Sequence, residues 1–102
     1  MEKNILTRVC EYYGITKEQM LGDRRQRPLV KARQASYWLY EHLTDFSYPR
    51  IGLIHNRDHT TILYGCEKIN NEIDNQTEDG KAVVKLFHDL RRVNDNQLEM
   101  AF

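Results

Sequence analysis

The sequence predicts an all-α protein, a compact domain of five to six helices. Apolar residues recur at intervals of three and four along most of the chain, which is the period of helices that pack on a core. Capping residues, glycines and prolines divide these segments into short helical lengths. No stretch alternates apolar and polar residues in the way of a half-buried strand.

The first half of the chain contains three of the expected helices. The first ends at Gly14, after apolar residues at helical spacing. Thr16 and Gln19 have the spacing of a capping box, which predicts a second, short helix that Gly22 ends. After a charged turn, Pro28 suits the first turn of a long helix that reaches about Leu43. Trp38 on this helix is expected to be the largest single piece of the core.

The second half contains the remaining helices. Ser47 is expected to cap a short helix from Tyr48 to about Ile54, and a tight turn over residues 55–57 follows. Asp58 is then a strong N-cap for a helix that reaches about Asn75. Residues 77–80 are expected to break the chain before a last helix around 83–90.

Length and composition are those of one small globular domain, expected over residues 1–93, with a loose tail over 94–102. Hydrophobic residues make up 40% of the chain, and no apolar run approaches the roughly 18 residues of a membrane span. Cys10 and Cys66 lie among apolar residues, which favours buried thiols in a reducing cytoplasm over a disulfide between them.

The charge is unevenly distributed although the net charge is zero. Residues 1–50 hold nine basic and six acidic residues, whereas residues 51–102 hold six basic and nine acidic ones. Five of the basic residues fall within residues 24–33, where there is no acidic residue. This local positive field is typical of a surface that meets a polyanion, with the acidic part of the chain turned away from it.

Two short helices joined by a tight turn predict a helix-turn-helix, whose second helix enters the DNA major groove. Its first residues are Asp58, His59, Thr60 and Thr61. Imidazole and hydroxyl groups can bond to base edges, and a threonine methyl can contact a thymine methyl. The alternative is that these residues only start a helix and face solvent.

The run Arg57-Asp58-His59-Thr60-Thr61 resembles the signature of the C-terminal DNA-binding domain of the bacterial replication initiator DnaA. The resemblance covers about residues 4–92. Further residues in the family's order and spacing are Val9, Tyr12-Tyr13, Arg24-Arg25, Arg27, Arg33-Gln34, Leu39, Leu43-Thr44, Ser47, Pro49, Ile51-Gly52, Ile62 and Lys68-Ile69.

The resemblance implies an all-α, Trp-repressor-like helix-turn-helix that binds DnaA-box DNA. It implies that the residues from Asp58 to Thr61 read the major groove and that Arg25 enters the adjacent minor groove. It also places Arg33 and Gln34 at the DNA surface and Ser47 at the start of a helix that lies on the DNA backbone. The expected DNA-binding set further includes Arg24, Arg27 and Arg57.

The expected function is therefore sequence-specific binding of double-stranded DNA, in replication initiation or its regulation. We expect no enzymatic activity and no cofactor, metal, nucleotide or membrane partner for this chain. The expected location is the bacterial cytoplasm, at the nucleoid, and other replication proteins are further candidate partners.

Three departures from the family pattern bear on this expectation. Four residues separate Gly52 from Arg57 where the family usually has five, although Asn56 tolerates the left-handed conformation of the missing glycine. Glu41 stands where the family often has a basic residue, which should weaken phosphate attraction. The chain also lacks the family's Gly-x-x-x-x-Gly-Lys-Ser/Thr loop. It is thus an excised domain or a stand-alone regulator of replication or transcription.

Other functions remain open at this point. Arg50 and His55 form a short motif that occurs in some all-α ribonucleases, with His55 as general base. His55 and His59 have the i, i+4 spacing of a metal pair, but no third ligand is evident. A DnaA-like domain could also have lost its DNA affinity and bind a protein instead, which the zero net charge and Glu41 favour.

Overall fold

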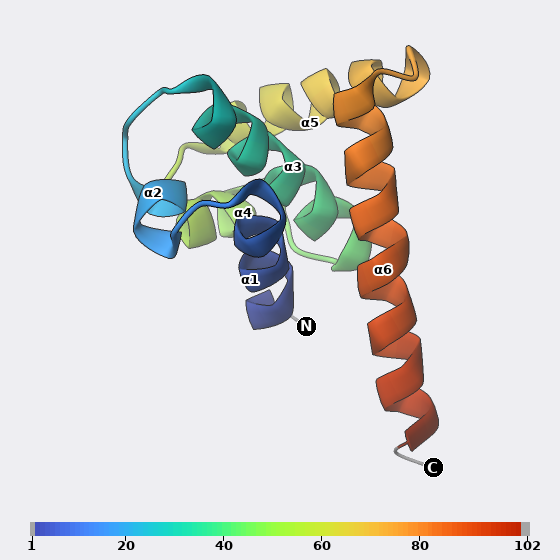
Figure 1. The fold of residues 1–102 in the computed structure, drawn as a ribbon. Helices are drawn as coiled ribbons and strands as arrows, with labels where there is room; N and C mark the ends of the chain where they lie inside the picture. Colours follow the sequence, from blue (N-terminus) through green and yellow to red (C-terminus); the bar gives the residue numbers. More distant parts are fainter. Residues whose placement is uncertain (1, 101–102) are drawn as a thin grey trace.

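The computed structural model describes the backbone of residues 2–100 and the side chains of residues 5–92. Within this part of the chain all regular structure is helical, which confirms the predicted fold class. The helices are α1 (Glu2–Tyr13), α2 (Lys17–Leu21), α3 (Arg27–Leu43), α4 (Tyr48–His55), α5 (His59–Asp74) and α6 (Glu78–Met100). Figure 1 shows the long α6 on one side of the molecule, with α2 on the opposite side. No described helix is both long and apolar enough to cross a membrane.

Two of the predicted helix starts have the expected caps. The Thr16 hydroxyl accepts from the Gln19 N–H at 3.1 Å, and the Gln19 side chain accepts from the Thr16 N–H at 2.9 Å. This reciprocal pair is the predicted capping box. The Ser47 hydroxyl accepts from the Arg50 N–H at 3.4 Å and so caps the start of α4.

The last helix differs from its prediction at both ends. Gln76 has φ 54°, and the Thr77 hydroxyl accepts from the Gly80 N–H at 3.1 Å. The chain break therefore lies at residues 75–77, and Gly80 belongs to α6. A glycine suits this position because a Cβ there would lie 2.4 Å from the Glu72 carbonyl oxygen. The backbone of α6 continues to Met100, through the segment for which a tail is expected.

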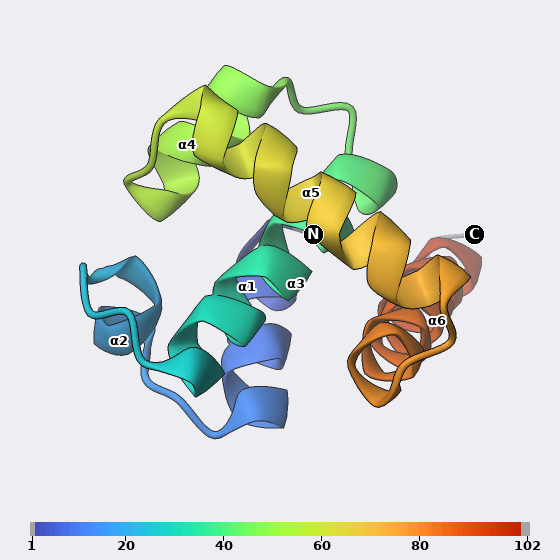
Figure 2. The ribbon, with the colours of Figure 1, turned by 90° about the horizontal axis from the view of Figure 1, so that it is seen from above.

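Helix α3 forms the centre of the core and contacts α1, α2, α4, α5 and α6. Its Trp38, 8% exposed, packs edge-on against Phe87 of α6 and donates from Nε1 to the Asn70 side chain of α5 at 2.8 Å. Trp38 thus joins three helices, in agreement with its predicted place in the core. Figure 2 shows α5 crossing over α3 toward α6.

Both cysteines are free and buried, as predicted. Burial raises the pKa of Cys10 and of Cys66 above the ordinary thiol value. Both groups are therefore held as uncharged thiols and act as small apolar core residues.

The turn between α4 and α5 depends on a close backbone contact. Asn56 adopts the predicted left-handed conformation, with φ 56° and ψ 46°. The Arg57 N–H donates to the Gly52 carbonyl at 2.8 Å. A Cβ on Gly52 would lie 2.4 Å from the Arg57 carbonyl oxygen, so a side chain there forces the turn apart. The shortened turn is closed by this contact.

His55 at the end of α4 is fully buried against α3. Its Nδ1 donates to the Ile51 carbonyl at 2.8 Å, which leaves Nε2 to accept from the Ser36 hydroxyl at 2.7 Å. The rings of Tyr37 and Tyr40 meet it edge-on, with centroids 4.8 Å and 5.3 Å away. Burial lowers the pKa of His55 to about 4.

Replacing Gly52 by alanine should destabilise the domain, although alanine favours helices elsewhere. Overpacking of this kind lowers the free energy of unfolding by about 1–3 kcal/mol. The control is Leu53→Ala, at the adjacent position of α4, where the side chain is 83% exposed. That change should stay within about 0.5 kcal/mol of wild type in urea unfolding. Equal stability of the two variants would contradict a close contact at Gly52.

Acid should destabilise the fold through His55. In the unfolded chain its pKa lies near 6.5, so below that pH the unfolded state binds a proton that the folded state excludes. Stability should therefore fall as the pH drops from 6.5 toward 4, by up to about 3 kcal/mol. NMR titration of the imidazole, with urea unfolding at matched pH values, measures both effects. An imidazole that titrates near pH 6.5 in the folded protein would refute this account.

Candidate nucleic-acid interface

The structure gathers most of the predicted DNA-binding residues on one side of the molecule. Both ribbon views show the α2–α3 loop beside the α4–α5 turn, with α6 on the far side. Exposed side chains of the loop, of the turn and of the first residues of the helices that follow them are Arg24, Arg25, Arg27, Asp58, His59, Thr60 and Thr61, and Ser47 is exposed at the start of α4. Gln34 and Arg57 are half-buried, and Arg33 is buried.

An open groove of about 620 Å³ runs between the α2–α3 loop and α5. From the predicted set it is lined by Arg25, Arg33, Gln34, Arg57 and Thr61. Its three arginines face one acidic residue, Asp23, so its lining carries a net positive charge. Such a groove suits an anionic chain.

The first turn of α5 exposes Asp58, His59 and Thr60, and the next residue, Thr61, lines the groove. Asp58 begins α5 as predicted, but its carboxylate makes no side-chain capping hydrogen bond. Instead Oδ2 accepts from the Thr60 hydroxyl at 2.6 Å, and Oδ1 lies 3.1 Å from Nδ1 of His59. The Thr60 hydrogen bond lowers the pKa of Asp58. The carboxylate thus orders its two neighbours at the tip of the helix.

Arg33 lines the groove, but only 5% of this residue is exposed. Its side chain is buried, and its guanidinium donates to four backbone carbonyls. The distances are 2.8 Å to Gln19, 2.9 Å to Met20 and 2.9 Å to Gly22, and the fourth carbonyl is that of Arg24. Arg33 therefore holds the end of α2 and the following loop. Burial, with the nearby charge of Arg57, lowers the pKa of its guanidinium.

Arg57 connects the two halves of the site. Its guanidinium donates to the carbonyls of His55 and Asn56 in its own turn, at 3.3 Å and 3.0 Å. It also donates to the carbonyl of Gly22, which accepts from Arg33 as well. The α2–α3 loop and the helix-turn-helix are thus joined through one carbonyl oxygen.

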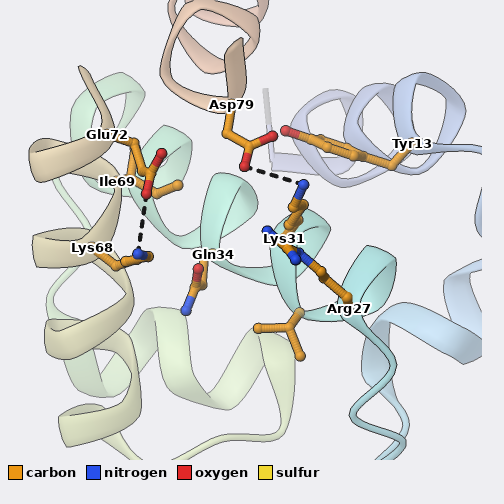
Figure 3. Close-up of a pocket in the computed structure, with 9 residues that line it drawn as sticks. Tyr13, Arg27, Lys31, Gln34, Lys68, Ile69, Glu72 and Asp79 are labelled. Carbon is orange, nitrogen blue, oxygen red and sulfur yellow. Dashed lines mark ion pairs between the residues drawn. The ribbon is translucent and has the colours of Figure 1, made fainter. Parts of the chain in front are cut away.

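Ser47 and the remaining arginines lie outside the groove lining. Ser47 caps α4 at the end away from the turn. Arg27 lines a second hollow of about 200 Å³ between α3, α5 and α6, which Figure 3 shows with Lys31 and Lys68 around it. Two of these three cations are neutralised, because Lys31 lies 3.2 Å from Asp79 and Lys68 lies 3.1 Å from Glu72. Val30 and Gln34 line both hollows, so the two are adjacent.

The geometry argues against the catalytic and metal roles considered for His55. Both of its ring nitrogens are bonded inside the core, so it is open neither to a substrate nor to a metal. The Arg50 guanidinium stacks on Phe46, 3.6 Å from the ring centroid. Among the described residues, no group of three or more His, Cys, Asp or Glu side chains could hold a metal ion.

Glu41 is engaged within the protein. Its Oε1 accepts from the Tyr48 hydroxyl at 2.8 Å, which ties α3 to the start of α4. Together with desolvation, this hydrogen bond raises the pKa of Tyr48 to about 12.

The sequence prediction missed Tyr64, which lines the groove and is 67% exposed. Its spacing of three residues after Thr61 places it on the same face of α5, one turn further along. This spacing could have included Tyr64 in the predicted set, which was restricted to the first turn of the helix.

The chain is similar to known bacterial proteins over most of its length. The family model described as bacterial dnaA protein helix-turn-helix matches residues 3–69. The chromosomal replication initiator protein DnaA of Synechococcus sp. is 37% identical over 90 residues, which are 87% of this chain and 19% of that protein. The protein of the same name from Mycobacteroides abscessus is 38% identical over 88 residues, 86% of this chain and 18% of its own. That of Chloroflexus aurantiacus is 45% identical over 74 residues, 72% and 15% respectively. The chain thus spans about a fifth of the length of these relatives.

Arg33→Met should destabilise the domain and loosen the α2–α3 loop, because it leaves carbonyls without donors. We expect a loss of about 2–4 kcal/mol in the free energy of unfolding. Arg24→Met, at an exposed position of the same loop, is the matched control and should change it by less than about 0.5 kcal/mol. Urea unfolding gives the stabilities, and amide exchange reports on residues 19–25. If the two variants behave alike, Arg33 does not hold the loop.

Proposed function

The chain belongs to the bacterial DnaA helix-turn-helix family, and we propose that it binds double-stranded DNA sequence-specifically, at a DnaA-box-like site. The observation that carries this proposal is the positively charged groove with α5 on one side and the arginine-bearing loop on the other. Two elements placed in this way can enter the major groove and the adjacent minor groove of one duplex. The DNA strand that separates these two grooves would then lie in the protein groove between α5 and the loop.

Each exposed residue has a distinct role in this arrangement. Asp58, His59, Thr60 and Thr61 meet base edges in the major groove from the first turn of α5. Arg25 enters the minor groove, where a guanidinium is favoured by the negative potential.

The other members of the predicted set act outside the grooves. Arg24 and Arg27 contact phosphates, Gln34 contacts the strand from the wall of the groove, and Ser47 marks where the start of α4 meets the backbone. Arg33 and Arg57 act indirectly, because their bonds to the Gly22 carbonyl orient the loop against α5.

The biological setting is proposed from the relatives. Their name, chromosomal replication initiator protein DnaA, favours binding at a replication origin or control of its use, at the bacterial nucleoid. Other replication proteins are then its further partners, and the domain itself carries out no catalysis.

A protein-interaction module is the second candidate. It is favoured by the ion pairs of Lys31 and Lys68 with acidic residues beside the groove, which reduce the attraction for a polyanion. The two functions differ in salt dependence. DNA affinity falls with a log–log slope of about −0.9 for each phosphate neutralised, whereas a predominantly apolar protein interface changes little.

The test begins with selection of bound duplexes from a random library, followed by competition binding at about 50–200 mM salt. His59→Ala and Arg25→Ala should each lower specific affinity by about 5–150-fold, as expected for a lost base contact of about 1–3 kcal/mol. Arg27→Ala should weaken specific and random DNA equally, because a phosphate contact carries no sequence information. Failure to enrich any sequence, together with salt-independent binding of duplex DNA, would overturn the proposal in favour of the interaction module.

A further inference from the structure

Tyr64 is an aromatic residue in the groove to which the predicted reading set gives no role. It is exposed, and it lines the groove together with Thr61, Arg25 and Gln34. Within the described part of the chain, its hydroxyl has no hydrogen-bond partner. One exposed tyrosine needs no explanation by itself. Tyr64 lines the groove between α5 and the α2–α3 loop, whereas the exposed Tyr12 lies on α1.

The backbone at this position is held firmly against α3. A Cβ on the adjacent Gly65 would lie 2.6 Å from Cδ2 of Tyr37, so α5 and α3 are in direct contact there. Any larger residue at position 65 would push α5 outward and move Tyr64 away from Gln34. Packing thus fixes the backbone of α5 beside Tyr64, whose side chain lines the groove.

The surroundings of Tyr64 favour an anionic, partly apolar ligand. The groove holds the guanidinium groups of Arg25, Arg33 and Arg57 against the single carboxylate of Asp23. Arg33 and Arg57 direct donors to backbone carbonyls, so their positive charge reaches the groove while their hydrogen bonds are used elsewhere. A ligand phosphate would therefore find positive potential here, and its hydrogen-bond donors would have to come from the other lining side chains, Arg25, Gln34, Thr61 and Tyr64. The Tyr64 hydroxyl can supply one.

We propose that Tyr64 clamps the DNA strand that separates the major and minor grooves. Its hydroxyl donates a hydrogen bond to one phosphate oxygen, and its ring packs on the adjoining deoxyribose. This inference rests on the proposed DNA binding and adds a contact to it. Because the phenol is uncharged, the contact strengthens binding without releasing a counterion.

The first experiment compares Tyr64→Phe with wild type on the selected site and on random duplex DNA. The variant keeps the ring and loses the donor. We expect about 10-fold weaker binding to both DNAs, as for a hydrogen bond to a charged group. The slope of log K against log salt should stay unchanged, whereas Arg27→Ala should reduce it by about 1. Tyr12→Phe, at the exposed tyrosine of α1, is the matched control and should bind as wild type.

The second experiment locates the contact. Phosphates of the selected site are replaced one at a time by uncharged methylphosphonates, and each duplex is measured with wild type and with Tyr64→Phe. At one phosphate, the loss of affinity caused by the methylphosphonate and the loss caused by Tyr64→Phe should not add, because both changes remove the same hydrogen bond. Additive losses at every phosphate would overturn the proposal. The proposal would also be overturned if Tyr64→Phe kept full affinity while Tyr64→Ala discriminated less against sites that lack a thymine methyl.

The outcomes also separate this inference from the function on which it rests. If wild type binds duplex DNA in a salt-dependent way and Tyr64→Phe matches it, only the Tyr64 contact is refuted. If wild type binds no duplex DNA, the proposed function itself is refuted. Thermal unfolding of Tyr64→Phe should coincide with that of wild type, since the hydroxyl has no partner among the described residues.

Discussion

The bonds of Arg33 to the end of α2 are the interaction on which the candidate interface depends. A helix of five residues is far too short to be stable alone, and its last carbonyls have no partners within it. The guanidinium of Arg33 supplies donors to these carbonyls from inside the core, and its positive charge suits the negative end of the helix. The loop that carries Arg24 and Arg25 begins directly after this anchored end, so its exposed arginines start from a fixed point.

The same anchor explains how two like charges can lie close together. Arg33 and Arg57 both donate to the carbonyl of Gly22, and the charge of Arg57 adds to burial in lowering the pKa of Arg33. The carbonyl dipoles of α2 and of the α4–α5 turn face the two guanidinium groups and offset the repulsion. Such bonds to charged groups contribute more than neutral ones, about 1.5–3 kcal/mol each. Part of the positive potential in the groove therefore comes from two arginines whose guanidinium groups stay bonded to backbone carbonyls of the protein.

Local signals in the sequence were sufficient to predict the helices and several caps. Thr16, Ser47 and Asn56 act on residues within four positions of themselves, and periodicity identifies the apolar face of each helix. The role of Arg33 could not be predicted in this way, because its acceptors lie 9 to 14 residues away and only the packed fold brings them together. An arginine in a basic run looks the same whether it faces solvent or backbone carbonyls. The place of Tyr64 in the groove likewise depends on how closely α3 and α5 approach at Gly65.

These contacts determine how much the shortened turn before α5 can change the position of that helix. A turn that lacks one residue would by itself leave the direction of the recognition helix open. Here α5 is held at three points: the Arg57 N–H bonds to Gly52, the Arg57 side chain bonds to Gly22, and Gly65 packs on Tyr37. None of these contacts depends on the missing residue, since Asn56 supplies the left-handed step that closes the turn. The position of His59 and Thr60 relative to Arg25 is therefore determined by the loop and by α3 more than by turn length. It follows that the shorter turn leaves α5 and the arginine-bearing loop facing each other across one positively charged groove.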